Sequence, residues 1–203
     1  MAKRRDNLRR RAPTRELKRR FLIVCEGQLT EPCYFKELRH LLKSPLELVV
    51  LPGGTPKMLV QRAVQEKNSA EQDARRRKDQ NLMYDEIWCV FDIDEHPFLA
   101  EAKQQALDNN INTAVSNPCF ELWVILHFQE QRAFIDRHAA RHLCRTYLPR
   151  YEKRLPCADL FPRYEDALRR ASELEQWHRS RGTTGDNPST GVHRLTEKIK
   201  AQS

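Results

Sequence analysis

The chain has 203 residues, of which 39% are hydrophobic and 32% charged, and its formal net charge is +8. This size and composition indicate one soluble domain with room for a small appendage. No apolar run approaches the roughly 20 residues that span a bilayer, and the basic N-terminus lacks the apolar stretch of a secretory signal. We therefore expect a cytoplasmic protein that does not associate with membranes.

The net charge is concentrated in residues 1–20, which hold ten lysines and arginines and two acids and so account for the whole excess. We expect this segment to form a basic, disordered arm. Arginine forks match phosphate oxygens, and basic residues gain affinity for phosphate backbones by displacing counterions. The arm therefore predicts contact with DNA or RNA, although a solvated tail that only aids solubility would have the same composition. The candidate nucleic-acid-binding residues are Arg4, Arg5, Arg9, Arg10, Arg11, Arg19 and Arg20.

After the arm, short apolar strands alternate with helices. The runs "FLIVCEG" (21–27) and "LELVVLPGG" (46–54) end in glycine and are typical of buried strands. Thr30 and Thr55, each followed closely by proline, predict the starts of helices after these strands. The highly charged stretch 66–81 is predicted to be a solvated end of the second helix or an excursion from it.

Two further strands and several helices complete the pattern. "DEIWCVFDIDEH" (85–96) and "INTAVSNPCF" (111–120) are predicted strands, separated by a helix over 98–110. "FELWVILHF" (120–128) is predicted to be a strongly apolar helix. Beyond residue 128 the predicted elements are all helical and span 132–149, 163–182 and the last part of the chain.

Four short apolar strands alternating with helices predict an α/β fold with a mostly parallel, four-stranded sheet flanked by helices. We divide the chain into the basic arm (1–20), an α/β core (21–128) and a helical C-terminal extension packed on the core (129–203). Ligands of such sheets bind beyond the carboxyl ends of the strands. Residues that follow the strands are therefore the first candidates for a functional site.

Acidic residues stand at the carboxyl ends of two predicted strands. Glu26 follows the first, and Asp92 and Asp94 end the third, where their spacing places both on one face of an extended strand. Close carboxylates repel one another unless a cation lies between them. Their oxygens suit a hard divalent ion such as Mg²⁺ or Mn²⁺, so the pattern predicts a three-carboxylate metal site for phosphoryl-transfer chemistry. A solvated D-x-D turn or a helix cap is the alternative.

Five further polar residues are candidates for a supporting role around this site: Glu95, His96, Asn117, Glu121 and Lys57. His96 could contact phosphate or relay a proton, or could be only a polar residue before proline. Asn117 and Glu121 could border the same crevice, or could cap and begin a helix. Lys57 lies in "PGGTPK", which fits no P-loop and is either an anion site or a simple turn.

Four separated motifs resemble the RloB-like family: "FLIVCEGQLTEPCYFKEL" (21–38), "VFDIDEH" (90–96), "SNPCFELWVILHF" (116–128) and "NPSTGVHRL" (187–195). The resemblance implies association with restriction and other antiviral defence loci of bacteria and archaea, and a core similar to the Toprim domain. By that resemblance, Asp92 and Asp94 bind magnesium, and Glu26 is either a metal ligand or a general acid/base. In the last motif, the Ser/Thr pair with His193 and Arg194 either touches phosphate or caps the final helix.

The sequence departs from the Toprim pattern in one respect, because "GQLTEPCYF" supplies no aspartate soon after Glu26. No ATPase motif is found, so we expect any nucleotide-driven partner to be a separate protein of the defence system. Together these features predict a divalent-metal-dependent nuclease acting on DNA or RNA in prokaryotic antiviral defence. The alternative is a non-catalytic nucleic-acid-binding or effector subunit of a multiprotein defence complex.

Overall fold

A computed structural model of the chain describes residues 18–93, 98–149, 151 and 155–203. The helices and strands follow in the order β1 (Arg20–Cys25), α1 (Thr30–Leu41), β2 (Glu47–Pro52), α2 (Pro56–Arg77), β3 (Glu86–Asp92), α3 (Leu99–Asp108), β4 (Asn112–Asn117), α4 (Glu121–Leu126), α5 (Arg137–Tyr147), α6 (Cys157–Leu160), α7 (Tyr164–Arg181), β5 (Ser189–Thr190) and α8 (Val192–Lys200). Short 3-10 turns lie at Gln80–Leu82 and Phe161–Arg163.

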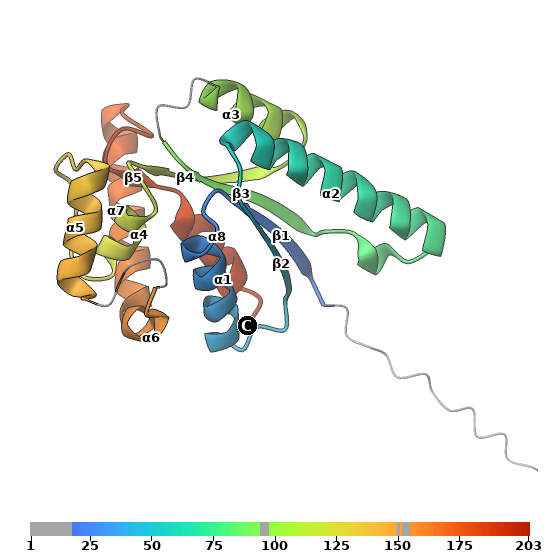
Figure 1. Ribbon diagram of the computed structural model, residues 1–203, viewed down its shortest axis with the longest axis horizontal. Helices are drawn as coiled ribbons and strands as arrows, with labels where there is room; N and C mark the ends of the chain where they lie inside the picture. Colours follow the sequence, from blue (N-terminus) through green and yellow to red (C-terminus); the bar gives the residue numbers. More distant parts are fainter. Residues whose placement is uncertain (1–17, 94–97, 150, 152–154) are drawn as a thin grey trace, which may run out of the picture.

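The strands form a single sheet in the order β2-β1-β3-β4-β5 (Figure 1). The first four strands are parallel, and β5 pairs antiparallel with β4 through Ser189 and Thr190. The expectation of an α/β fold with a mostly parallel sheet is thus confirmed, whereas the predicted number of four strands is wrong. The fifth strand was missed because its two polar residues carry no apolar run that would mark a strand.

The element boundaries differ from the predicted ones where local signals compete. β1 begins at Arg20, so the last residue of the predicted arm belongs to the sheet. The charged stretch after residue 66 continues α2 without a break as far as Arg77, and Lys78, with φ at 53°, ends the helix in the left-handed conformation. Thr55 caps α2 as predicted, accepting a hydrogen bond from the backbone N–H of Met58 at 3.5 Å. Thr30, in contrast, is the first residue of α1 and gives it no side-chain cap.

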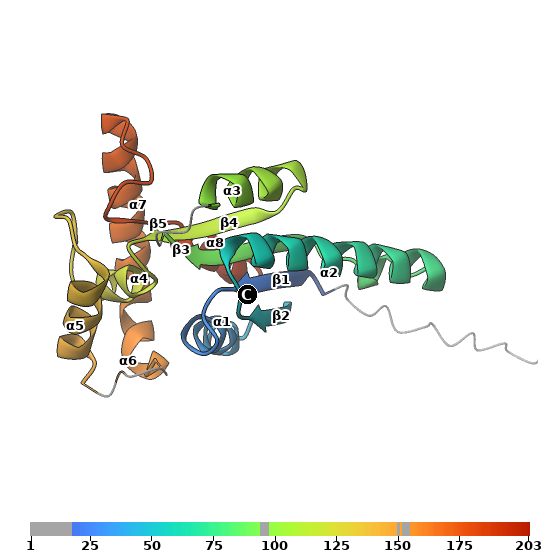
Figure 2. The same cartoon turned by 45° about the horizontal axis from the view of Figure 1, so that its top comes forward.

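Side chains of the strands alternate between the two faces of the sheet and bury two hydrophobic clusters. Leu22 and Val24 pack with α2 and α3, while Phe21 and Ile23 pack with α1 and with α4 to α8. Figures 1 and 2 show α2 and α3 on one side of the sheet and α1 on the other. The segment after residue 128 therefore shares its hydrophobic core with β1 and α1.

β1, β3 and β4 run in the same direction and finish at one edge of the sheet, beside α4 and α5 (Figure 1). The chain passes from β4 to α4 through a cis peptide bond between Asn117 and Pro118. This edge brings together the residues that end the parallel strands and the first turns of α1 and α4. Within the described residues, every helix is too short or too polar to cross a lipid bilayer.

Candidate functional site

A cavity of about 240 Å³ lies at the carboxyl edge of the sheet, between the ends of β1 and β3 and helices α1, α4 and α5. We call it the acidic cavity, because four carboxylates and two arginines line it. These charged residues are Glu26, Glu31, Asp92, Glu121, Arg137 and Arg141.

Glu26 and Asp92 are held together by the pairing of β1 with β3. The backbone N–H of Glu26 donates to the carbonyl of Val90 at 2.9 Å, which extends the parallel ladder one residue beyond β1. The backbone N–H of Asp92 in turn donates to Oε2 of Glu26 at 3.2 Å. The Glu26 side chain is therefore fixed across the end of β3, beside the aspartate that ends this strand.

Glu31 enters the cavity from the first turn of α1 and is only 6% exposed. Its carboxylate packs against Gly27, where an added Cβ would overlap the carboxylate oxygens. Burial raises the pKa of Glu31, backbone N–H groups oppose the rise, and the charges of Glu121 and Glu26 add to it. The absence of a side chain at position 27 is what allows this carboxylate to reach the cavity.

Glu121 enters from the first turn of α4, and its side chain is oriented by two donors. The hydroxyl of Tyr151 donates to Oε1 at 2.9 Å, and Nε of Arg141 donates to the same oxygen at 3.3 Å. The thiol of Cys144 donates to the backbone carbonyl of Glu121 at 3.4 Å, which fixes the start of α4 against α5. Glu121 is thus a buried carboxylate with a defined orientation rather than a solvated first-turn acid.

Two arginines of α5 face the carboxylates. Arg137 and Arg141 are four residues apart and so lie on the same side of their helix. Nη2 of Arg137 lies 3.3 Å from Oδ2 of Asp92, and Arg141 contacts Glu121 as described. Among the described residues that line the cavity, two cations stand against four carboxylates, so this part of the lining carries an excess of negative charge.

The excess charge is reflected in the titration of Asp92. Burial raises the pKa of Asp92 well above its usual range. The three other carboxylates of the acidic cavity raise it further, and the guanidinium of Arg137 opposes them. Such crowding of buried carboxylates is the setting that a hard, oxygen-loving divalent cation relieves.

The donor chemistry of the acidic cavity therefore fits a magnesium or manganese ion, with Glu26 and Asp92 as the first candidate ligands and Glu31 and Glu121 beside them. In the part of the chain that the structure describes, no group of three or more His, Cys, Asp or Glu side chains is already arranged around a common ion position. Arg137 and Arg141 partly explain why the carboxylates are not arranged around an ion. Their guanidinium groups contact Asp92 and Glu121, and a bound ion would compete for these carboxylates.

Of the other residues predicted for the site, Asp94, Glu95 and His96 lie outside the described residues. Lys57 is elsewhere: its amine lies 3.6 Å from Glu101 of α3, and it does not line the acidic cavity. Asn117 donates from Nδ2 to the carbonyl of Gly185 at 3.0 Å, so it anchors a C-terminal loop. Of the three predicted supporting residues that the structure describes, Glu121 is the one that lines the cavity.

The predicted arm residues Arg19 and Arg20 lie at the opposite edge of the sheet, and the other five predicted arginines fall in the undescribed segment 1–17. Nε of Arg20 lies 2.7 Å from Glu47, and its guanidinium stacks over Tyr84. Arg19 lies within 3.7 Å of Asp85. Both side chains therefore have structural partners.

Sequence reasoning missed Glu31, Arg137 and Arg141. Glu31 was passed over because an acid in the first turn of a helix is commonplace. The two arginines come from a helix far along the chain, and only their four-residue spacing on one helix side could have drawn attention to them.

A family-wide sequence profile described as RloB-like protein matches residues 21–199. The chain belongs to the RloB-like family. The match includes the acidic cavity with all six of its charged residues. Neither a curated protein nor a solved structure gives a significant match.

Proposed function

We propose that this RloB-like protein is a divalent-metal-dependent nuclease that hydrolyses phosphodiester bonds of DNA or RNA in a prokaryotic antiviral defence system. The observation that carries the proposal is the pair of carboxylates, Glu26 and Asp92, at the ends of adjacent parallel strands, with Glu31 and Glu121 crowded beside them. A glutamate after the first strand and an aspartate at the end of a later parallel strand also support a Toprim-like core.

Magnesium or manganese is the proposed cofactor, held by Asp92 and Glu26, with Asp94 as a further predicted ligand. A bound divalent cation would supply Lewis-acid polarisation of the phosphodiester and offset its negative charge. Glu31 and Glu121 complete the carboxylate lining of the acidic cavity.

The protein's own residues would bind and orient the phosphodiester. Arg137 and Arg141 present guanidinium groups from one side of α5, and such forks bind phosphate oxygens in two-point contacts. Binding would require Arg137 to exchange Asp92 for the phosphate, an exchange that neutralisation of Asp92 by a cation favours. Glu26, whose side chain accepts from the backbone N–H of Asp92, would take the proton of an attacking water.

The basic arm would supply affinity that does not depend on base sequence. Residues 1–17 carry seven lysines and arginines and precede β1 in the sequence, and the first residue of β1, Arg20, lies at the end of the strand away from the acidic cavity. Affinity and chemistry are thus assigned to opposite ends of the same strand. A separate defence-system protein would restrain or trigger the nuclease.

The test compares Glu26→Gln with Glu47→Gln, a glutamate at the amino edge that pairs with Arg20. Labelled single-stranded and double-stranded DNA and RNA are incubated with wild type and both variants in magnesium or manganese. We expect cleavage by wild type, a loss of at least about a hundredfold in Glu26→Gln, and a change within about twofold in Glu47→Gln. Cleavage at equal rates by the two variants would remove Glu26 from the reaction.

A second candidate function is a non-catalytic nucleic-acid-binding or effector subunit of a multiprotein defence complex. The contacts of Arg137 with Asp92 and of Arg141 with Glu121 favour it, because they partly neutralise the acidic cavity without an ion. In that case wild type binds the labelled strands and leaves all four intact in both metals. This outcome would replace the nuclease by the binding subunit.

A further inference from the structure

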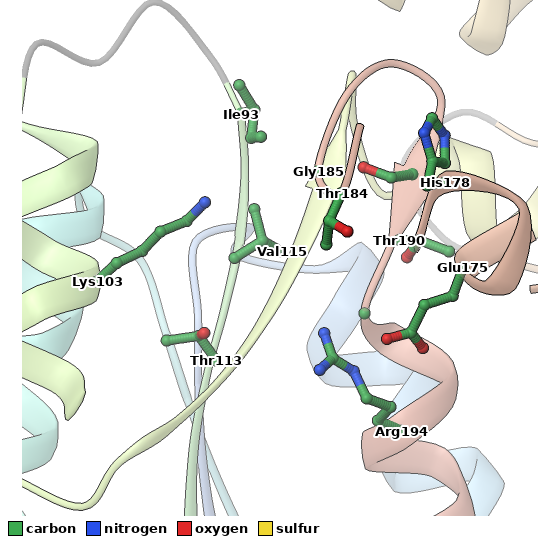
Figure 3. A pocket seen from close by; sticks show the side chains of 12 residues that line it. Ile93, Lys103, Thr113, Val115, Glu175, His178, Thr184, Gly185, Thr190 and Arg194 are labelled. Carbon is green, nitrogen blue, oxygen red and sulfur yellow. The ribbon is translucent and has the colours of Figure 1, made fainter. Parts of the chain in front are cut away.

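A second cavity, of about 250 Å³, lies on the other face of the same sheet edge (Figure 3). Successive side chains of an extended strand point to opposite faces. Asp92 accordingly lines the acidic cavity, whereas Ile93, the next residue, lines this second cavity. Its floor is formed by β4, and its walls by α3 on one side and by α7, β5 and the start of α8 on the other. We call it the basic cavity.

Two cations reach into the basic cavity from opposite walls. Figure 3 shows Lys103 extending from α3, and Arg194 extending from α8. The guanidinium of Arg194 folds back over Gly191, where an added Cβ would stand 2.9 Å from Nη2. Among the described residues, no carboxylate lies within ion-pair distance of either side chain. Partial burial lowers the pKa of Lys103.

One carboxylate, Glu175, also lines the basic cavity, but its oxygens are already engaged. Nη2 of Arg179 lies 3.1 Å from Oε1, and Nε2 of His193 lies 2.9 Å from Oε2. The charge of Arg194 also helps to lower the pKa of Glu175, against the effect of burial. The oxygens of Glu175 are thus bonded by Arg179 and His193, and its charge offsets part of the charge of Arg194. Among the described residues, no side chain accepts a hydrogen bond from Arg194 or Lys103, so their donors are available to an anion.

The wall opposite α3 is built before any ligand arrives. The two ring nitrogens of His178 contact Oγ1 of Thr183 at 2.9 Å and the carbonyl of Pro188 at 2.8 Å. Asn117 holds the same loop through the carbonyl of Gly185. A preformed wall lowers the entropy lost when a ligand binds. It also explains what Asn117 does at the end of β4.

The rest of the lining limits the kind of anion. Ile93 and Val115 offer an apolar surface, and Thr113 and Thr184 add hydroxyl groups to the lining. The volume falls just below the range of roughly 300–1,000 Å³ typical of small-molecule sites, which suits a ligand of one nucleotide rather than a duplex. We propose that the basic cavity binds a nucleoside monophosphate, with its phosphate between Lys103 and Arg194 and its nucleoside against Ile93 and Val115.

The test is isothermal titration calorimetry of the full chain with adenosine 5′-monophosphate, in the presence of a chelator so that the acidic cavity holds no divalent cation. Inorganic phosphate and adenosine serve as the two partial ligands. We expect each of them to bind at least about tenfold more weakly than the monophosphate, because each uses only part of the lining. Equal affinity for inorganic phosphate and the monophosphate would overturn the nucleoside part of the proposal.

The double variant Lys103→Ala, Arg194→Ala tests the phosphate part, and Lys57→Ala, Lys198→Ala is its matched control. The control removes two exposed lysines from α2 and α8 that do not line the basic cavity. We expect the first pair to raise Kd at least about thirtyfold and the control to change it less than about threefold. Equal Kd values in the two double variants, or no heat of binding in wild type at millimolar monophosphate, would overturn the proposal. Because cleavage is not measured, the result is independent of the proposed nuclease activity.

Discussion

The two ends of β3 both carry acids, but in opposite electrostatic settings. At the amino end, the backbone N–H of Arg20 donates to Oδ2 of Asp85 at 2.6 Å, and Nε of Arg19 lies 3.7 Å from Oδ1. Glu86 is approached by Arg19 at 3.6 Å and by Lys198 at 3.7 Å. At the carboxyl end, the described lining of the cavity that holds Asp92 adds three other carboxylates and two arginines.

The charges at the amino end of β3 stabilise the fold, whereas those at the carboxyl end form a candidate functional site. Matched pairs at a strand end satisfy one another and fix neighbouring segments. Crowded carboxylates with raised pKa values oppose folding, and clusters of this kind are typical of functional sites. We therefore expect substitutions at the two ends of one strand to differ in kind.

The largest expected contrast is in cleavage. Asp92→Asn should reduce the rate of phosphodiester hydrolysis by at least about a hundredfold, because it removes a proposed metal ligand. Asp85→Asn, at the other end of the strand, should change the rate by less than about twofold. Initial rates on labelled DNA and RNA measure both. A similar loss in both variants would mean that the two ends do not differ in role.

The next contrast is in the response to metal. Manganese at about a hundred times its Kd should stabilise wild type by about 2.7 kcal/mol, which raises Tm by roughly 5–10 °C in a chain of this size. The same shift should appear in Asp85→Asn and be absent in Asp92→Asn. Thermal unfolding followed by circular dichroism, with and without manganese, gives the three shifts. An undiminished shift in Asp92→Asn would place the ion elsewhere.

A further contrast concerns the basic arm and its proposed binding of DNA or RNA. Deletion of residues 1–17, which removes seven lysines and arginines, should weaken binding of a DNA or RNA strand by about ten- to thirtyfold at low salt. It should also flatten the dependence of log Kd on log salt concentration. Arg20→Ala, which loses the contact with Glu47, should lower Tm and leave that slope unchanged. An unchanged slope after the deletion would show that the arm makes no phosphate contacts.

The smallest expected effects are on stability, and they differ in sign. Without divalent metal at pH 8, Asp92→Asn should raise Tm by about 2–4 °C, and Asp85→Asn should lower it by a similar amount as a charge-assisted hydrogen bond is weakened. The folded-state pKa of Asp92 is raised, so its contribution to stability is present below its unfolded pKa and is lost as pH rises through the folded value.

The gain in Asp92→Asn should consequently shrink toward pH 4. Unfolding curves recorded at several pH values test this trend. A gain that stays constant between pH 4 and pH 8 would show that crowding of charge is not its cause.

The positions of Glu26 and Asp92 at the ends of strands could be predicted from local sequence patterns. The apolar runs before Glu26 and Asp92 mark two strands, and parallel strands that neighbour each other finish at one edge. Strand direction places both carboxylates at the same edge of the sheet, but their contact depends on the pairing of β1 with β3, which the strand order of the fold provides. Asp94 was predicted by the same pattern and lies outside the described residues.

The remaining parts of the cavity depend on tertiary packing that local patterns do not encode. Arg137 is 45 residues beyond Asp92, and only the docking of α5 against α4 brings the two together. β5 was missed for a related reason, since two polar residues form a strand only because β4 offers its edge to them. Secondary-structure elements that depend on such long-range contacts have few signals in their own sequence.

The turn at Gly27 has a consequence for how this protein can vary. A single methyl group at that position would displace the Glu31 carboxylate. The number of acids in the cavity therefore depends on residue 27 having no Cβ atom. Gln28, its exposed neighbour, is under no such constraint. Random mutagenesis under selection for the protein's activity should accept more residues at position 28 than at position 27, where each side chain displaces Glu31. Position 27, which needs glycine to leave room for Glu31, is thus the more restricted of the two positions in this turn.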